Sequence, residues 1–330
     1  MTARDIVPES SGSPAVEVLT FGETMLSVRT AEPLTAGGGA RITVAGAESN
    51  VAVGLARLGH RAGWAGRLGA DEPGRTVLRA LRGEGVDLRH ATVDETAPTG
   101  VMLREGRVGD IARVHYWRSG SAASRQRPEH LAGALAAGAR ILHLTGITPA
   151  LGEGPRATVV GAVRHAREHG RTVTLDVNHR ERLWSGAEAA PVLRSLLPDV
   201  DVLIASEEEL SIVAGAPGDG ERDRVSELFS GGVGEVVVKL GAEGARVHHR
   251  DGSTTGAPAR RVTVRDTVGA GDAFCAGYLS GLLDGLAAGA RLERAVVCGA
   301  FAVACEGDWE GLPHRDELTL LDGAPGRTVR

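Results

Sequence analysis

The chain has 330 residues, of which 42% are hydrophobic, and its formal net charge is −5 at pH 7. A chain of this length can bury a large core, either in one α/β domain or in one domain with a small appendage. The acidic balance and the lack of a basic tract argue against nucleic acid as the main partner. An apolar run of about 18 residues, which a membrane-spanning helix would need, is also missing, so we expect no membrane partner.

The cysteines and the N-terminus indicate a cytoplasmic protein. Cys275, Cys298 and Cys305 are sparse, odd in number and without a CxxC spacing. Such a set suits reduced thiols. Residues 1–15 contain Ser, Pro and Gly but no apolar stretch typical of a signal peptide. This composition predicts a disordered tail.

Short apolar runs alternate with helical patterns along the chain. The runs are apolar on both faces, as in strands of a covered parallel sheet, and the helical segments end near glycine or polar residues. The predicted strands are residues 16–22, 141–146, 172–178, 201–206 and 235–241. The predicted helices are residues 49–59, 75–83, 156–169 and 292–305. The alternation predicts a three-layer α/β/α fold with a mostly parallel central sheet.

Two polar segments, residues 29–45 and 99–118, interrupt this alternation. They show β-like alternation without helical periodicity, so both can leave the core as strands and pair with each other. The predicted core then consists of residues 16–28, 46–98 and 119–330.

The segment AGAESNVA, residues 45–52, joins the first of these segments to a helix. Gly46 permits close approach of a ligand to the backbone. The Asn50 amide can donate to and accept from sugar hydroxyls. The alternative is a capped helix with a buried asparagine.

The segment RVHYWRSGSAA, residues 113–123, concentrates aromatic side chains in a protein with only 3% of them. On a strand, Tyr116 and Arg118 lie on the same face. A phenol beside a guanidinium suits a small ligand that carries a carboxylate. The alternative is an aromatic pair, Tyr116 and Trp117, that packs on an exposed strand.

Polar residues also follow two predicted core strands. In DVNHRERLW, residues 176–184, Asn178 and Arg180 alternate onto one side at a strand end, where parallel strands line a ligand crevice. The alternative is a loop asparagine and a surface arginine. Ser206 and Glu209 follow the next strand, and their alternative is an ordinary helix N-cap.

The segment VKLGAEGA, residues 238–245, joins two β-like runs, and Gly241 and Gly244 are typical of a hairpin turn. Lys239 is the only lysine in the chain, although Lys and Arg together number 37. The presence of lysine here, where arginine is used elsewhere, indicates that this position favours a slender side chain with a compact charge.

The segment DTVGAGDAF, residues 266–274, follows a strand-like run, residues 261–265, and opens a long apolar helix. Backbone N–H groups of Gly269, Ala270 and Gly271, together with the helix dipole, predict an anion site. Asp272 adds a candidate base, and an anion hole beside a base suits phosphoryl transfer to a hydroxyl. The alternative is an aspartate that only stabilises the first helical turn.

These segments carry a resemblance to a known family. Residues 266–274 resemble the C-terminal signature of the ribokinase-like (phosphofructokinase B) carbohydrate kinases. Residues 45–52 resemble that family's N-terminal GGAxxN signature, with Ala45 in place of the first glycine. The YxR and DxNxRxxLW patterns resemble the 2-keto-3-deoxygluconate kinase branch, although His179 stands where tyrosine is frequent. The resemblance covers roughly residues 16–320 and implies the ribokinase-like fold, with a small β-sheet lid.

The resemblance implies ATP and Mg²⁺ as cofactors and leaves room for a monovalent cation such as K⁺. It implies Asp272 as the catalytic base and an anion hole formed by Gly269, Ala270 and Gly271. Nucleotide contacts are implied for Asn178, Ser206, Lys239, Gly241 and Gly244. A contact to Mg²⁺ through water is implied for Glu209. Substrate contacts are implied for Gly46, Asn50, Tyr116, Arg118, Arg180 and Asp308.

The expected function is ATP-dependent phosphorylation of the terminal hydroxyl of an acid sugar, 2-keto-3-deoxygluconate to its 6-phosphate. A related kinase of a neutral sugar such as fructose or ribose, or of a nucleoside, is one alternative. A catalytically silent sugar sensor on the same fold is another. A dinucleotide-binding dehydrogenase is disfavoured, because Glu23-Thr24-Met25 follows Gly22 where its GxGxxG fingerprint would stand. Both the gluconate and the galactonate epimer are candidate substrates. Exposed lid edges lead us to expect a homodimer or a larger homo-oligomer.

Overall fold

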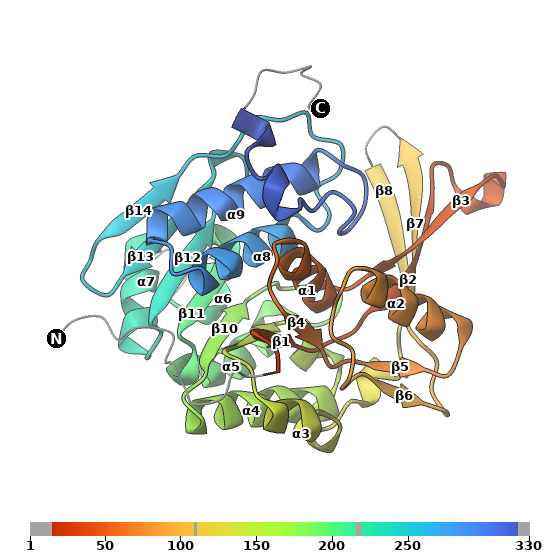
Figure 1. Ribbon diagram of the computed structural model, residues 1–330, viewed down its shortest axis with the longest axis horizontal. Coiled ribbons are helices and arrows are strands. Elements are labelled where there is room, and N and C mark those ends of the chain that lie inside the picture. The colour runs from red at the N-terminus through yellow and green to blue at the C-terminus, as the bar shows by residue number, and fades with distance from the viewer. Residues whose placement is uncertain (1–14, 109–110, 216–219, 323–330) are drawn as a thin grey trace.

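The computed structural model describes residues 15–108, 111–215 and 220–322. The predicted tail, apart from Ala15, lies outside the described residues. Helices cover both faces of a large central sheet, and a smaller sheet stands at one side of this body (Figure 1). Among the helices described, none has the length and apolarity to cross a membrane. The three-layer α/β fold expected from the alternation is confirmed.

The central sheet has eight strands in the order β14-β13-β12-β11-β10-β9-β1-β4. Neighbours from β12 to β4 are parallel, while β13 and β14 are antiparallel additions at one edge. The strands are β1 Val18–Thr20, β4 Ala62–Trp64, β9 Ile141–Thr145, β10 Thr172–Asp176, β11 Val202–Ser206, β12 Glu235–Lys239, β13 Ala245–His249 and β14 Thr254–Ala257. Each predicted strand of the core is present, and β1 is the one most shortened relative to its prediction.

Consecutive side chains of the central strands enter two separate hydrophobic cores. In β11, Leu203 packs on one side of the sheet and Ile204 on the other. This arrangement explains why the strands read as apolar on both faces. The helices on the Ile204 side include α1 Ala47–Arg57, α2 Glu72–Gly83, α8 Ala270–Leu283 and α9 Ala288–Val303. Those on the Leu203 side are α3 Pro128–Ala137, α4 Glu153–Glu168, α5 Gly186–Leu196, α6 Glu207–Val213 and α7 Glu221–Ser230.

The second sheet has four strands in the order β3-β2-β7-β8. They are β2 Met25–Thr30, β3 Ala40–Ala45, β7 Val101–Val108 and β8 Ile111–Trp117. The two segments that interrupt the sequence alternation therefore lie in one sheet, joined by the parallel pairing of β2 with β7. This sheet begins at Met25, before the predicted boundary at residue 29. A further short pair, β5 Arg67–Gly69 with β6 Thr92–Asp94, was not expected.

The prediction of a strand at residues 261–265 is wrong, because these residues belong to none of the three sheets. The chain has by then left β14, the edge strand of the central sheet. The Arg265 N–H donates instead to the carbonyl of Val303 at the end of α9, at 2.7 Å. Val264 is 61% exposed, so its apolar character reflects no buried strand.

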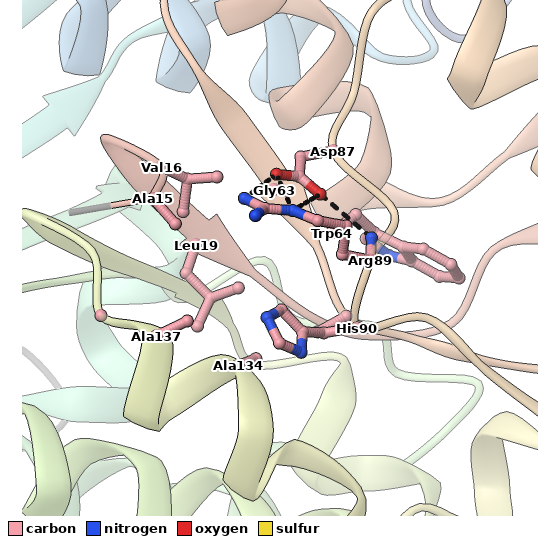
Figure 2. Close-up of a pocket in the computed structure, with 12 residues that line it drawn as sticks. Ala15, Val16, Leu19, Gly63, Trp64, Asp87, Arg89, His90, Ala134 and Ala137 are labelled. Carbon is pink, nitrogen blue, oxygen red and sulfur yellow. Dashed lines mark hydrogen bonds and ion pairs between the residues drawn. The ribbon is translucent and has the colours of Figure 1, made fainter.

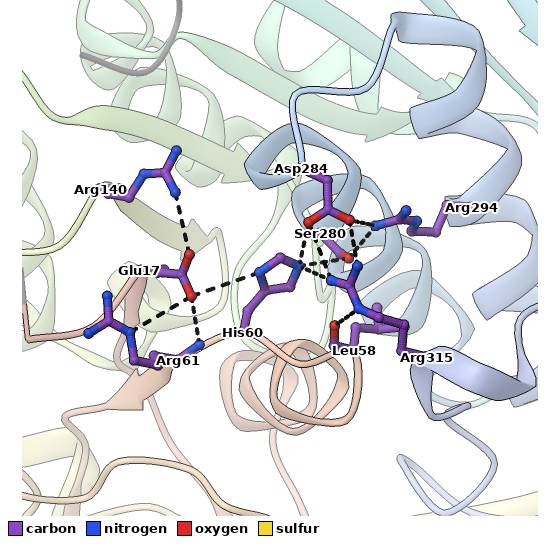
Figure 3. Close-up of polar contacts among 9 residues, drawn as sticks. All are labelled: Glu17, Leu58, His60, Arg61, Arg140, Ser280, Asp284, Arg294 and Arg315. Carbon is purple, nitrogen blue, oxygen red and sulfur yellow. Dashed lines mark hydrogen bonds and ion pairs between the residues drawn. The ribbon is translucent and has the colours of Figure 1, made fainter. Parts of the chain in front are cut away.

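A polar cluster fixes the C-terminal end of α8 (Figure 3). His60 is buried, and its Nε2 lies 2.9 Å from Ser280 Oγ and 2.9 Å from Arg315 Nη2. Asp284, just after α8, accepts a hydrogen bond of 2.8 Å from Arg315 Nη1. Burial lowers the pKa of His60, so the ring is neutral at pH 7. The cluster ties α8, whose other end begins with Gly269 and Ala270, to the C-terminal residues.

Candidate active site

Asp272 lies in the first turn of α8 and is 7% exposed. Its Oδ2 accepts a hydrogen bond of 2.7 Å from Asn50 Nδ2, and its Oδ1 accepts one of 3.3 Å from Asn178 Nδ2. Burial raises the pKa of Asp272 to about 7, although the bond from Asn50 acts in the opposite direction. A carboxylate with this pKa can accept a proton at neutral pH. Two asparagines from two further sequence motifs therefore meet at this candidate base.

The loop before α8 leaves backbone donors available for an anion. Gly269 precedes the helix with φ +75°, and no side chain caps the helix. A Cβ at Gly269 would lie 1.8 Å from the carbonyl oxygen of Asp308, so this position requires glycine. The N–H groups of Gly269 and Gly271 donate to no residue in the described part of the chain, whereas Ala270 N–H makes a long 3.4 Å contact with Thr267 O. These donors at a helix N-terminus suit a phosphate.

Asp266 connects this loop to the four-stranded sheet. Its Oδ2 accepts from Arg104 Nη1 of β7 at 2.6 Å and from Arg29 Nη2 of β2 at 3.2 Å. The backbone N–H of Gly307 also donates to Oδ2, at 3.3 Å. These contacts of Asp266 were not among the sequence predictions. Two arginines on strands expected to pair, and an aspartate opening the GAGD signature, were the signals that could have revealed it.

Arg118 and Tyr116 are adjacent, as their alternation predicted, but the charge of Arg118 is already compensated. Arg118 Nε donates to Glu23 Oε2 at 2.6 Å, and Ser121 Oγ donates to Glu23 Oε1 at 2.6 Å. The guanidinium lies 5.6 Å from the centre of the Tyr116 ring. Glu23 is buried, so this ion pair is shielded from solvent on the carboxylate side.

The charge of Arg180, in contrast to that of Arg118, is not compensated by a carboxylate of the described residues. Arg180 is exposed, and its Nη1 reaches only the carbonyl of His179 at 3.4 Å. Among the residues that the structure describes, no carboxylate forms an ion pair with it. Its charge nevertheless lowers the pKa of Asp272, which places the guanidinium within electrostatic range of the base.

Asp308 is buried near the same loop, although an aspartate after a helix is usually solvated. Burial raises its pKa to about 7, and the charges of Glu310 and Asp272 add to this effect. The structure thus holds two carboxyl groups with similar pKa values close to the anion loop.

Two of the predicted glycines have a packing reason that the sequence analysis did not foresee. A Cβ on Gly46 would lie 2.4 Å from the carbonyl oxygen of Glu23, so the close approach there is backbone on backbone. Gly244 has φ +104°, and a Cβ on it would lie 2.1 Å from Ala257 O. Gly241, with φ +56°, faces open space.

Ser206 and Glu209 form a capping box at the start of α6. Glu209 Oε2 accepts from Ser206 N at 2.7 Å, and Ser206 Oγ accepts from Glu209 N at 3.2 Å. Glu209 Oε1 accepts from His179 N at 2.9 Å. The helix-cap alternative is therefore present. The described residues contain no cluster of three side chains suited to a metal ion, so a role of Glu209 through water stays a prediction.

Lys239 pairs with a residue that the sequence analysis did not select. Its Nζ lies 2.7 Å from Asp176 Oδ1 and 3.7 Å from Glu209 Oε2. Burial disfavours its charge, but Asp176 and Glu209 together raise the pKa of Lys239 above its ordinary value. Asp176 stands two residues before Asn178 at the same strand end, and that spacing could have identified it.

A separate small pocket lies between β1, β4 and α3 (Figure 2). Its charged side chains Asp87 and Arg89 bond to each other, with Nη2 and Oδ2 2.6 Å apart. It contains none of the residues around Asp272. The candidate active site is instead the group around Asp272, where two asparagines contact a buried carboxylate beside the loop donors.

Comparison with known proteins identifies the family to which the chain belongs. The profile of the pfkB family carbohydrate kinases matches residues 16–315. A 2-dehydro-3-deoxygalactonokinase of Haloferax volcanii is 36% identical over 318 residues, covering 94% of this chain and 98% of the relative. A 2-dehydro-3-deoxygluconokinase of Bacillus subtilis is 34% identical over 324 residues, covering 95% of this chain and 97% of the relative. The crystal structure of a 2-dehydro-3-deoxygluconokinase from Thermotoga maritima superposes with a TM-score of 0.84 at 28% identity, covering 93% of this chain and 100% of that one. The chain belongs to the pfkB family of carbohydrate kinases.

Proposed function

We propose that this kinase transfers the γ-phosphoryl group of ATP to the terminal hydroxyl of a 2-keto-3-deoxy sugar acid. The gluconate compound, converted to its 6-phosphate, is the expected substrate, and the galactonate epimer is the nearest competitor. The observation that carries the proposal is the similarity to two kinases of 2-dehydro-3-deoxy sugar acids over 94% and 95% of this chain. The relatives differ in the epimer, as the sequence analysis left open.

The charges around the site support an acidic substrate. Arg180 is exposed and has no carboxylate partner among the described residues, whereas Arg118 is neutralised by Glu23. A substrate carboxylate would therefore find its uncompensated cation at Arg180, while Tyr116 and Arg118 form a wall beside it. Gly46 and Asn50 are proposed to border the sugar hydroxyls, and Asp308 is proposed to contact one of them.

In the proposed reaction, Asp272 takes the proton from the attacking hydroxyl, and Asn50 and Asn178 hold the carboxylate in place. The N–H groups of Gly269, Ala270 and Gly271 stabilise charge on the transferring phosphoryl group. The four-stranded sheet is proposed to act as a lid that excludes water. Asn178, Ser206, Lys239, Gly241 and Gly244 are proposed to border the nucleotide.

Mg²⁺ fits this site only as a partner of the nucleotide phosphates. Both oxygens of Glu209 already accept backbone N–H bonds, so this carboxylate would act on the ion through water. When bound, Mg²⁺ neutralises negative charge on the phosphates. A dependence on K⁺ stays an expectation, which replacement of K⁺ by tetramethylammonium in the assay would test.

We also propose a cytoplasmic homo-oligomer. Ile42 on β3 and Trp117 on β8, the two edge strands of the small sheet, are 63% and 60% exposed, which suits a partner subunit. Cys275, Cys298 and Cys305 are all free, which suits a reducing compartment. Sedimentation velocity on the purified protein would measure the assembly, and a monomer would contradict this proposal.

A panel of acceptors tests the proposed function. Purified protein with ATP and Mg²⁺ is assayed for ADP release with both 2-keto-3-deoxy acids, gluconate, fructose, ribose and a nucleoside. We expect the highest kcat/KM with a keto-deoxy acid. Equal turnover of fructose would contradict the acid-sugar assignment, and no turnover of any acceptor would favour the catalytically silent sensor.

Arg180→Gln should raise KM for the keto-deoxy acid by roughly 10- to 100-fold, the weight of a charge-assisted hydrogen bond. Arg118→Gln is the matched comparison, and its effect should be partly relieved in the double variant Glu23→Gln/Arg118→Gln, which leaves no unpaired buried carboxylate. Steady-state kinetics with the acid and with a neutral acceptor provide the measurement. A KM unchanged in Arg180→Gln would rule out this residue as the carboxylate partner.

A further inference from the structure

A buried ion pair lies directly behind the candidate base. Asp176, at the end of β10, is 1% exposed, and its Oδ1 receives Lys239 Nζ at 2.7 Å from the end of β12. The other oxygen, Oδ2, accepts from Asn178 Nδ2 at 3.3 Å and from Cys275 Sγ at 3.4 Å. Asp176 thus contacts a residue that bonds to Asp272 and a residue one turn further along α8.

Asn178 is the bridge between the ion pair and the base. Its Nδ2 donates to Asp176 Oδ2 and to Asp272 Oδ1, both at 3.3 Å. Its φ is +38°, and no other non-glycine residue in the described ranges has a positive φ. An asparagine adopts this conformation when its side chain is held by local hydrogen bonds, and such outliers gather at functional sites. Here both carboxylates hold that side chain.

Lys239 also lies against the anion loop. Its Nζ would be 3.7 Å from a Cβ built on Gly271, the residue before the base. The cation is therefore close both to Asp176 and to the backbone of the loop at Gly271. An aspartate alone at this depth would place a second negative charge beside the base, and Lys239 offsets it.

We propose that Asp176 and Lys239 form a positioning pair for the base: the pair holds the Asn178 amide against Asp272 and sets the charge behind that carboxylate. The proposal rests on the kinase function proposed above. It assigns Lys239 a role in addition to a contact with nucleotide, and it gives Asp176, the first residue of the DxNxRxxLW pattern, a role beside the base.

The charges around Asp272 shift its pKa in opposite directions. Asp176 raises the pKa of Asp272, while Lys239 and Arg180 lower it. Cys275 stays neutral because burial raises its pKa far above the ordinary value. Asp308 lies in the loop after α9, and the charge of Asp272 adds to the effect of burial in raising its pKa. A base must be unprotonated to act, so activity is lost as the pH falls through its pKa.

The test compares the acidic limb of kcat/KM against pH in two variants. Asp176→Asn removes the charge that disfavours ionisation of the base, so its limb should move to lower pH by roughly 1 unit. Lys239→Met removes a favourable charge, so its limb should move to higher pH by a similar amount. The double variant Asp176→Asn/Lys239→Met should fall between them, and Lys239→Arg should keep the wild-type limb.

A purely structural role would lower activity in both single variants without moving the limbs in opposite directions, and that result would overturn the proposal. So would a Lys239→Met variant with a raised KM for ATP and an unmoved limb, because Lys239 would then be a phosphate contact alone. If Lys239→Met does not fold, Asp176→Asn and the double variant still give the sign.

A second readout separates this proposal from the proposed function. The Asp272 carboxyl is titrated by ¹³C NMR without sugar or nucleotide, and its signal is identified by its absence in Asp272→Asn. Opposite displacements of this titration in the two single variants support the pair even if the kinase turns over a different sugar. Equal or absent displacements overturn it even if the keto-deoxy acid is the substrate.

Discussion

Asp272→Asn is expected to lower kcat by roughly 10²- to 10⁴-fold, the usual contribution of a general base. The amide has the same shape and its oxygen can still accept the bond from Asn50, which is 2.7 Å long in the native protein. It cannot take a proton from the attacking hydroxyl. The measurement is steady-state kcat with ADP detection, together with calorimetric binding of ATP, which should be nearly unchanged.

Asp308→Asn is the matched control, because burial raises the pKa of that carboxyl to about 7 as well. We expect it to alter KM for the sugar more than kcat. If Asp308→Asn removed activity while Asp272→Asn kept it, the assignment of the two carboxyl groups would be reversed.

Wild-type activity should also fall as the pH drops below about 7, where Asp272 becomes protonated.

Gly269→Ala should lower kcat by roughly 10²- to 10³-fold, comparable to the loss of an oxyanion-hole donor. The new Cβ would meet the carbonyl oxygen of Asp308 at 1.8 Å, and the backbone would have to abandon φ +75°. Either movement turns the loop donors away from the phosphoryl group. Kinetics at saturating ATP and a thermal melt together measure the effect.

Gly285→Ala is the control for Gly269→Ala, because it introduces backbone strain without a steric clash. Gly285 also has a positive φ, +69°, but a Cβ there meets nothing within 4 Å. It should cost only about 1–2 kcal/mol of stability and leave kcat unchanged. Equal kinetic losses in the two variants would show that general destabilisation, and not the loop geometry, explains the first result.

The sequence predicted the parts of the site that obey a local rule. Asn178 was predicted at the end of a parallel strand, where ligand crevices form, and Asp272 at a helix start, and the structure brings the two side chains together. Gly269 could be assigned to an anion loop because an N-terminal helix turn with small residues leaves N–H groups free. The apolar runs predicted strands that are buried on both faces, and therefore a sheet covered by helices on both sides.

The parts that failed or were missed depend on partners distant in sequence. Glu23 neutralises Arg118 across 95 residues, and Asp176 receives Lys239 across 63. The second contact requires knowing that β10 and β12 flank β11. Residues 261–265 carry the alternation of a strand, but no strand of the central sheet lies beyond β14 to receive them.

The meeting of Arg29 and Arg104 on Asp266 has a thermodynamic consequence. Two strands of the small sheet supply cations to the carboxylate that opens the anion loop. The free energy of ordering this loop therefore depends on where the small sheet places these two arginines. By linkage, a ligand that orders the loop must change the equilibrium of the sheet by the same coupling energy. If nucleotide binds at this loop and sugar beside the small sheet, as proposed, each would strengthen the binding of the other.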